Sequence, residues 1–388
     1  MLDSVLDVFR VRQYFDVATR ARELAGGLRD DLGLLDDARR AIVRLPTDRT
    51  EVRGPAFPAA RPFANGLGRL ERLALVATGG SGALASVVGV ARALEESGVR
   101  PSVISLCSGS ALFGFPLAAG KSAEEVADFV LGLQPEDYLD LDWSKLSSLV
   151  TTMGRGFAGL LRGEAVERAY HRLLGDMTLG DLPIPAYAPI WNIEENRVEY
   201  LGPKTHPDLA VARAVHLAVA LPLFLAPVEL DGYHWCDGGI VDIFPVHPLL
   251  DLEEPCEVTL AVNGFYPPSF AGEEQFGWED RRASILYVAS QVRTSQQIEL
   301  ARENLTRLRR ASEVLMIEPV SYEEVRGIGF YRQFLSTRDW ARFMRAGRQA
   351  TRRALMARSA HPGLMAVSST TNQRASSGAI VGGEPLGP

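Results

Sequence analysis

Short apolar runs alternate with helically spaced apolar residues through the middle of this chain. Leu73–Ala77 is an unbroken apolar run, and from Val87 to Leu94 apolar residues recur every three or four positions. The same order follows with a run at Val103–Leu106 and helical spacing over Leu112–Ala119. Turns of glycine and other small residues separate each run from its helix, so the pattern predicts a βαβ unit. Unbroken apolar strands are typical of a parallel sheet covered on both faces, and we expect an α/β fold.

The second half of the chain adds more strands and helices. Tyr187–Ile193 and Val198–Leu201 are predicted to be strands paired around a polar turn. Val228–Leu230 and His234–Cys236 are predicted to form a hairpin, because Asp231-Gly232 between them favours the turn. The other expected elements are mainly helical structure over 121–180, a helix over Ala210–Ala220, a strand at Val258–Val262, a long charged helix over 281–312 and a strand at Val314–Ile317.

Composition divides the chain into three parts. Residues 1–45 have helical periodicity, and residues 46–68 are rich in Pro, Gly and Arg, as linkers are. We therefore expect a helical N-terminal arm and linker over 1–68, which either stands apart or packs against the main domain. The main domain is predicted over 69–358, and a disordered tail over 359–388, where Ser, Thr, Gly and Pro dominate.

Charge is unevenly distributed along the chain. The formal net charge is -7, so the whole molecule is not predicted to bind nucleic acid. Nine arginines and one acidic residue lie between Arg326 and Arg358, which gives this segment +8 and leaves -15 for the rest. Arginines at helical spacing there either pair with acids elsewhere in the chain or contact an anionic membrane surface. The stripe consists of Arg338, Arg342, Arg345, Arg348 and Arg352.

Cysteine content and hydropathy favour a cytoplasmic protein. The three cysteines, Cys107, Cys236 and Cys256, are too few for a disulfide scaffold and fit a reducing compartment. Because no cysteine or histidine has zinc spacing, we expect no metal and no other cofactor. The N-terminus lacks the pattern of a signal peptide, and no apolar stretch is long enough to span a bilayer. Contact with a membrane would therefore be peripheral.

Three segments hold residues suited to chemistry. The turn Gly79-Gly80-Ser81-Gly82 lies between a predicted strand and helix, where converging backbone amides can bind a phosphate or an oxyanion. Ser108 lies at the next strand-to-helix turn, where a serine is either a helix cap or a nucleophile. Asp237 precedes two glycines, and this sequence by itself favours a plain turn. Each signal is weak alone, and their combination is what indicates a site.

Together the three segments resemble the patatin-like phospholipase family. The stretch Ile104-Ser-Leu-Cys-Ser-Gly-Ser-Ala-Leu-Phe-Gly114 is similar to that family's nucleophile strand, which reads I-S-G-T-S-A-G-A-L-x-G. Asp231-Gly-Tyr-His-Trp-Cys-Asp-Gly-Gly-Ile-Val-Asp242 is similar to its D-G-G block, and Leu179–Pro185 and Ala214–Val228 also fit. The resemblance runs in the right order from about residue 72 to residue 262.

The resemblance implies a three-layer α/β/α fold with a mostly parallel central sheet. By position, Ser108 would be the nucleophile and Asp237 its base, and Gly79, Gly80 and Ser81 would supply oxyanion-hole amides. The implied function is a serine-dependent lipid acyl hydrolase, a carboxylic ester hydrolase that acts on phospholipids, lysolipids or neutral lipids. The alternatives are an acyltransferase with the same acyl-enzyme and a lipid-binding pseudoenzyme. A histidine-based triad is a rival mechanism, although the sequence pairs no histidine with a carboxylate.

The chain departs from the family's pattern around both turns. The oxyanion motif, normally G-G-G-x-R-G, here reads Gly-Gly-Ser-Gly-Ala-Leu, so Ala83 replaces the basic residue. Leu106 and Ser110 replace the glycines two residues before and after the nucleophile. Because glycine has backbone freedom that leucine lacks, we expect these changes to lower turnover and glycine at both positions to raise it.

Overall fold

The computed structural model describes residues 56–64, 66–67, 71–134, 137–140, 159–271, 285–325, 333 and 337–360. The helices predicted over residues 1–45 and the tail predicted beyond residue 360 lie outside this part of the chain. The domain boundaries therefore stay predictions.

A central sheet runs through the described domain in the order β10-β9-β1-β2-β4-β8-β7, with β5 also paired to β4. One half is parallel and consists of β10 (Glu313–Ile317), β9 (Val258–Val262), β1 (Leu73–Ala77), β2 (Val103–Ser105) and the start of β4 (Ala186–Asn192). The other half is antiparallel and consists of β5 (Arg197–Leu201), β7 (Val228–Leu230) and β8 (Tyr233–Asp237). The predicted strands and the mostly parallel sheet are confirmed.

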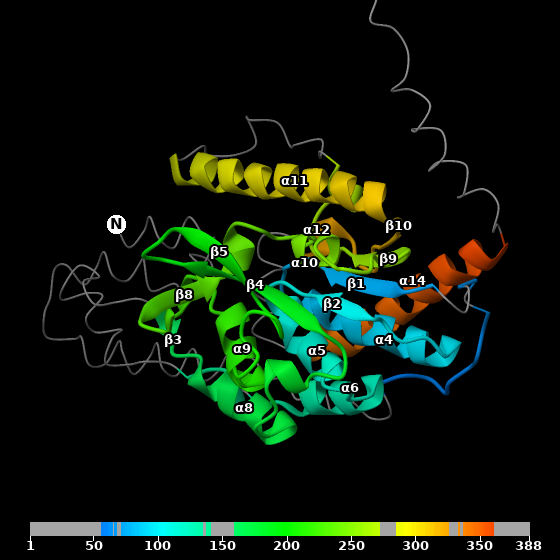
Figure 1. The fold of residues 1–388 in the computed structure, drawn as a ribbon, viewed down its shortest axis with the longest axis horizontal. Helices are drawn as coiled ribbons and strands as arrows, with labels where there is room; N and C mark the ends of the chain where they lie inside the picture. Colours follow the sequence, from blue (N-terminus) through cyan, green and yellow to red (C-terminus); the bar gives the residue numbers. More distant parts are fainter. Residues whose placement is uncertain are drawn as a thin grey trace, which may run out of the picture.

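Helices cover both faces of this sheet (Figure 1). Alternate residues of β1 point to opposite faces, as the pleat requires. Leu73 and Leu75 belong to one buried cluster, shared with helices on the lower side of Figure 1, while Ala74 and Val76 belong to a second cluster with α11. On the α11 (Ile285–Ala311) side lies α10 (His247–Leu250), and the opposite side holds α4 (Ser86–Ser97), α5 (Gly109–Ala118), α6 (Ala123–Gly132) and α14 (Trp340–Ala360). The layered α/β fold is confirmed.

Turns and one small sheet complete the domain. Asp231 and Gly232 both have positive φ, 52° and 80°, as a tight hairpin between β7 and β8 requires. The segment 121–180, predicted to be mainly helical, also contains β3 (Gly159–Leu161), which pairs in parallel with β6 (Leu223–Leu225). Periodicity does not identify a three-residue strand, and β3 and β6 lack the adjacent hairpin turn that marked β7 (Val228–Leu230). The remaining helices are α8 (Glu164–Leu174), α9 (Val211–Ala218) and α12 (Tyr322–Val325).

Helix α14 packs directly on α4. A Cβ added at Gly89 would lie 1.8 Å from the carbonyl oxygen of Met344, and one added at Gly347 would lie 2.1 Å from that of Ser86. Beside this crossing, the buried Glu96 carboxylate accepts hydrogen bonds from the Arg348 and Arg352 guanidinium groups. Backbone contact and a buried ion cluster therefore join the two helices.

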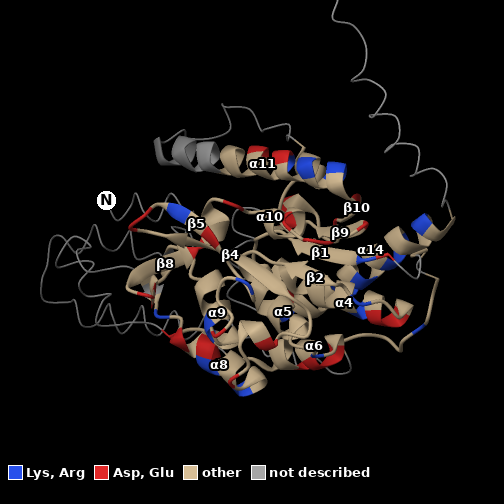
Figure 2. Ribbon diagram, in the orientation of Figure 1, with Lys and Arg blue, Asp and Glu red and all other residues tan. Residues whose placement is uncertain are grey.

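Figure 2 marks the basic positions along α14. Three of the five arginines of the stripe have acidic partners among the described residues. Arg342 pairs with Glu324, and Arg348 and Arg352 both pair with Glu96. Beyond the stripe, Arg358 pairs with Glu71 and Glu313, each at 2.8 Å. The sequence left two interpretations of this segment, and these residues show the first of them, pairing with acids elsewhere in the chain.

The described end of the predicted linker also contacts α14. The Arg352 guanidinium donates to the Arg61 carbonyl at 2.7 Å and lies 4.2 Å from the centre of the Phe63 ring. Phe57 is buried at 3% exposure. The sequence left two interpretations of residues 1–68, and the described part of this segment packs against the main domain. No helix in the described ranges is both long and apolar enough to cross a membrane.

Candidate active site

The three predicted motif segments meet at one end of the sheet. The backbone N–H of Gly79 donates to the Ile243 carbonyl at 2.9 Å, which joins the glycine turn to the D-G-G block. On the nucleophile strand, the Ser105 hydroxyl donates to the Pro245 carbonyl at 2.6 Å. The Cys107 thiol lies 3.5 Å from the Asp242 carbonyl. Contacts between residues 164, 140 and 135 positions apart therefore join the glycine turn and the nucleophile strand to the same region of the chain.

Ser108 occupies the turn between β2 and α5 in a strained backbone conformation. Its φ is 51° and its ψ is -126°, a combination that costs a non-glycine residue about 1–3 kcal/mol. Its side chain makes no capping hydrogen bond to α5, although it is the residue that precedes the helix. Ser108 is also half-exposed between buried neighbours. Of the two readings, nucleophile and cap, this geometry favours the nucleophile.

The two departures beside Ser108 fit the local structure. Leu106 is fully buried, and a Cβ at Gly114 of α5 would lie 2.2 Å from its Cδ2 atom, so Gly114 provides the space that Leu106 fills. The Ser110 hydroxyl accepts from the Cys107 N–H and donates to the Cys107 carbonyl, both at 2.8 Å. Leu106 does not have positive φ. Position 106 therefore does not use the backbone freedom of glycine, and both side chains support the turn.

The glycine turn lies against Ser108. A Cβ at Gly79 would lie 3.3 Å from the Ser108 Cβ, and a Cβ at Gly109 would lie 2.3 Å from the Gly80 carbonyl oxygen. The Gly79 N–H already donates a hydrogen bond to the Ile243 carbonyl. Within the described part of the chain, the backbone N–H groups of Gly80 and Ser81 donate no hydrogen bond. These two amides are available to a ligand beside Ser108.

Asp237 ends β8 in a buried position. Asp237 pairs with Ile190 of β4 in the antiparallel part of the sheet, and its backbone N–H donates to the Ala220 carbonyl at 3.0 Å. The residue is 1% exposed, and its carboxylate Oδ1 accepts the Gly239 N–H at 2.8 Å. A Cβ at Gly239 would lie 2.7 Å from the Cys107 Sγ, so the D-G-G turn contacts the residue next to Ser108. The fold thus brings the predicted nucleophile and base segments into contact.

Comparison with known proteins agrees with this arrangement. Residues 75–250 match the family model described as patatin-like phospholipase. These residues form a patatin-like phospholipase domain. All five predicted site residues lie within the match.

Several curated proteins resemble the patatin-like domain. An uncharacterised NTE family protein of Mycobacterium tuberculosis is 28% identical over 195 residues, which cover 50% of this chain and 49% of that protein. Human patatin-like phospholipase domain-containing protein 6 is 28% identical over 181 residues, 45% of this chain and 12% of that protein. The lysophospholipase nte1 of Emericella nidulans is 26% identical over 208 residues, 52% of this chain and 13% of its own length. The match to the mycobacterial protein spans about half of that protein's length, and the other two matches cover smaller fractions of those proteins, 12% and 13%.

Solved structures also align with the chain at low similarity. VipD from Legionella pneumophila has a TM-score of 0.42 and 15% identity, with 79% of this chain and 72% of VipD covered. Human GIVD cytosolic phospholipase A2 has a TM-score of 0.43 and 11% identity, with 74% and 63% covered.

Buried acidic groups surround Cys107 in the patatin-like domain. Burial raises the pKa of the Cys107 thiol well above its usual range, and the carboxylates of Asp237 and Asp242 add to this effect. The thiol therefore stays protonated and is not a competing nucleophile, since the thiolate is the reactive form. Burial also raises the pKa of Asp242, although its hydrogen bond with the Tyr200 hydroxyl opposes the shift.

Sequence reasoning missed the polar residues that hold the D-G-G block from α11. Gln297 donates from Nε2 to the Gly239 carbonyl at 2.8 Å. Asn304 donates from Nδ2 to the Asp242 carboxylate at 3.1 Å and to the Phe244 carbonyl at 2.9 Å. These residues lie in a helix whose sequence is polar on most sides, so spacing alone does not distinguish them from solvent-facing residues.

A second missed contact holds the glycine turn. The buried Ser81 hydroxyl donates to Oε1 of Gln333 at 2.9 Å. Gln333 is itself 1% exposed. Ser81, which replaces a family glycine, therefore has a specific side-chain partner.

Two histidines of the patatin-like domain have close carboxylate partners that the sequence did not indicate. His216 Nδ1 lies 2.8 Å from Glu167, and His234 Nδ1 lies 2.6 Å from Glu194. Both glutamates lie outside the D-G-G block, so neither pair is the histidine–aspartate half of a triad built on Asp237.

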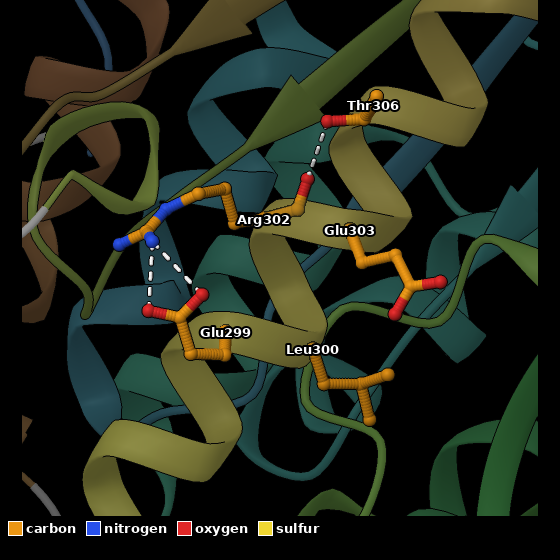
Figure 3. A pocket seen from close by; sticks show the side chains of 5 residues that line it. All are labelled: Glu299, Leu300, Arg302, Glu303 and Thr306. Carbon is orange, nitrogen blue, oxygen red and sulfur yellow. Dashed lines mark hydrogen bonds and ion pairs between the residues drawn. The ribbon is translucent and has the colours of Figure 1, made fainter.

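One surface hollow lies apart from the motifs (Figure 3). All of its lining residues come from α11, and the Arg302 guanidinium there pairs with Glu299 at 2.7 Å. Since charged side chains dominate it, this hollow does not suit an acyl chain. No cluster of three His, Cys, Asp or Glu residues with metal-binding geometry occurs in the described ranges.

Proposed function

We propose that this protein is a serine-dependent lipid acyl hydrolase with Ser108 as nucleophile and Asp237 as base. The observation that carries the proposal is the strained, half-exposed Ser108 at the strand-to-helix turn. The glycine turn lies against it, and the turn after the buried Asp237 contacts its neighbour Cys107. A strained serine at this junction is the geometry of a nucleophile elbow. The patatin-like match to residues 75–250 supports the reaction class.

The proposed reaction proceeds through an acyl-enzyme. Ser108 Oγ attacks the ester carbonyl carbon while its proton passes to the Asp237 carboxylate. The oxyanion that forms accepts hydrogen bonds from the Gly80 and Ser81 N–H groups, and Gly79 holds the turn through Ile243. When the carbon–oxygen bond to the leaving alcohol breaks, the alcohol takes the proton from Asp237. Water then attacks the acyl-enzyme, gives its proton to Asp237, and releases the fatty acid as Ser108 recovers the proton.

The proposed substrates are acyl esters of phospholipids, lysolipids or neutral lipids. A lysophospholipid is the first to test, because a similar protein of Emericella nidulans is named a lysophospholipase. The same site has two alternative functions. Acyl transfer would use an alcohol or amine in place of water, and a pseudoenzyme would bind lipid without turnover.

The test is labelling by a fluorophosphonate probe together with lysophospholipid hydrolysis. Ser108→Ala should lose all labelling and hydrolysis, and peptide mapping of the wild type should place the label on Ser108. Asp237→Asn should lower kcat by about 100-fold or more, because it cannot accept the proton. Ser97→Ala at the end of α4 and Asp231→Asn in the β7–β8 turn are the matched controls.

Four results would contradict the proposal. A label on Ser110 or Ser81 would refute the assignment of the nucleophile. Retained activity in Asp237→Asn, with loss in a His234 or His247 variant, would establish a triad. A folded wild-type protein that binds lysolipid vesicles but neither labels nor hydrolyses would be a pseudoenzyme, while esters formed with added alcohol would indicate a transferase.

A further inference from the structure

Helix α11 contacts the D-G-G block from outside the family match, which ends at residue 250. Gln297 and Asn304 are seven residues apart, so they project from the same face of the helix. Both side chains donate to this block, Gln297 to Gly239 and Asn304 to Asp242, and Asn304 also donates to Phe244 just after it. The block therefore receives side-chain hydrogen bonds from a helix that follows it by some 50 residues.

The orientation of the Gln297 amide is fixed by a second contact. Its Oε1 accepts the Tyr266 hydroxyl at 3.3 Å, which leaves Nε2 to donate to Gly239 at 2.8 Å. Tyr266 is in turn held by Asn263, whose Oδ1 accepts the Tyr266 N–H at 2.9 Å. The donor that reaches Gly239 is thus held by a chain of hydrogen bonds and not by one flexible side chain.

Gly239 transmits this contact to the aspartate. Its carbonyl accepts from Gln297 and its N–H donates to Asp237 Oδ1, also at 2.8 Å. The residue has little space in which to move, since a Cβ there would lie 2.7 Å from Cys107 Sγ and 3.0 Å from Asp237 Oδ1. Two successive glycines have the most flexible backbone of any pair, so the hydrogen bond from Gln297 adds a directional restraint to this packing.

We infer that Gln297 is a positioning residue, which fixes the Asp237 carboxylate for proton transfer through the backbone of Gly239. The inference rests on the proposed function of Asp237 as base. Proton transfer requires hydrogen-bond reach, and a supporting residue that fails to hold its geometry within about 0.5 Å lowers the rate without removing the reactive groups. The opposing interpretation is that Gln297 only attaches α11 to the domain.

Steady-state kinetics of Gln297 variants distinguish the two interpretations. Gln297→Leu keeps the volume and loses the donor, and Gln297→Glu keeps an acceptor for Tyr266 but cannot donate to Gly239. Both should lower kcat on a lysophospholipid about 10-fold, with KM within twofold and the midpoint of thermal unfolding near that of the control. Gln297→Asn keeps a donor on a shorter side chain and should retain intermediate activity. Gln296→Leu, at the exposed neighbouring position, is the matched control.

A double-mutant cycle with Tyr266 tests the chain of hydrogen bonds. Tyr266→Phe should lower kcat about threefold in the wild type and have no effect on kcat in Gln297→Leu, because the two residues act through one contact. Gln297 variants with wild-type kcat, or with kcat losses that only follow their loss of thermal stability, would overturn the inference. Ser108→Ala measured in parallel separates this result from a failure of the proposed function, which would appear as an unlabelled wild type.

Discussion

Ser108 holds a backbone conformation that neighbouring side chains must stabilise. The strain of about 1–3 kcal/mol at positive φ persists only where surrounding contacts fix it. Here the Ser110 hydroxyl makes two hydrogen bonds to Cys107, and Leu106 fills the space beside Gly114. The residues that differ from the family's glycines are therefore the ones that contact the turn.

This packing reverses the effect expected of restoring the glycines. Leu106→Gly combined with Ser110→Gly should lower both thermal stability and kcat, where the sequence alone suggests a gain. Removing a buried leucine side chain costs about 2–5 kcal/mol, and the lost Ser110 hydrogen bonds add to this. Differential scanning fluorimetry and kcat per probe-labelled site, measured well below the unfolding temperature, check the prediction.

Leu112→Gly is the matched control, since Leu112 lies on the same helix as Gly114 but is only half-buried. A folded double variant with kcat above wild type would show that Leu106 and Ser110 restrain the turn more than they support it.

Helices α8 and α9 are joined by a charged contact next to the strand that carries Asp237. Glu167 of α8 accepts hydrogen bonds from Arg213 and His216 of α9, both at 2.8 Å. Burial of Glu167 favours its neutral form, but hydrogen bonds and positive charge from these two partners outweigh burial and lower its pKa to about 2. Helix α9 leads to Ala220, whose carbonyl accepts the Asp237 N–H. The Glu167 contact therefore holds a helix that is linked to Asp237 by a backbone hydrogen bond.

The lowered pKa predicts how stability depends on pH. A carboxylate with a folded pKa of about 2 and an ordinary value of 4.5 contributes stability above about pH 4.5. That contribution is lost as the pH falls from 4.5 towards 2. Glu167→Gln should therefore be about 1–3 kcal/mol less stable than wild type at pH 7, with the difference shrinking below pH 4.5.

Urea unfolding at pH 7, 5, 4 and 3 measures this difference. Glu164→Gln, one turn earlier on α8 in an exposed pair with Arg168, should show little effect at any pH. A Glu167→Gln deficit that stays constant from pH 7 to pH 3 would disprove the role of its charge.

The elements that could be predicted from the sequence are those with local signals. The apolar run at Leu73–Ala77 and the Asp231-Gly232 turn identify a strand and a hairpin without any distant contact. Ser108 and Asp237 were predicted through motif resemblance. Gln297 was not, because its role comes from a hydrogen bond to Gly239 across 58 residues. Nor does the sequence show which acids pair with Arg348 and Arg352, since Glu96 lies some 250 residues away.

Across the whole molecule, the arginine-rich segment is less available for partners than its sequence suggests. Arg342, Arg348 and Arg352 have acidic partners within the domain. Among the described residues of α14, Arg345 and Arg353 are exposed and have no ion pair. Contact between α14 and an anionic membrane stays a proposal, and it now rests on these two residues.

Vesicle co-sedimentation tests that proposal. Binding should require anionic lipid and weaken with salt, and Arg345→Gln with Arg353→Gln should lower affinity about 10-fold or more, at roughly 1 kcal/mol for each arginine near the surface. Arg348→Gln should instead lower thermal stability, because it leaves part of the buried Glu96 charge without its partner. Equal binding to neutral and anionic vesicles, or no change in the double variant, would exclude α14 as the membrane contact.

The strand order has a consequence for where this domain can be cut. The family match ends at residue 250, but β1 lies between β2 and β9, and β9 begins only at Val258. A fragment ending at Leu250 would leave one side of β1 as an open edge, and every residue of that strand is buried and apolar in the whole domain. Unpaired apolar edges recruit other chains, so such a fragment would tend to aggregate. The segment that matches the family model is therefore shorter than the segment that can fold.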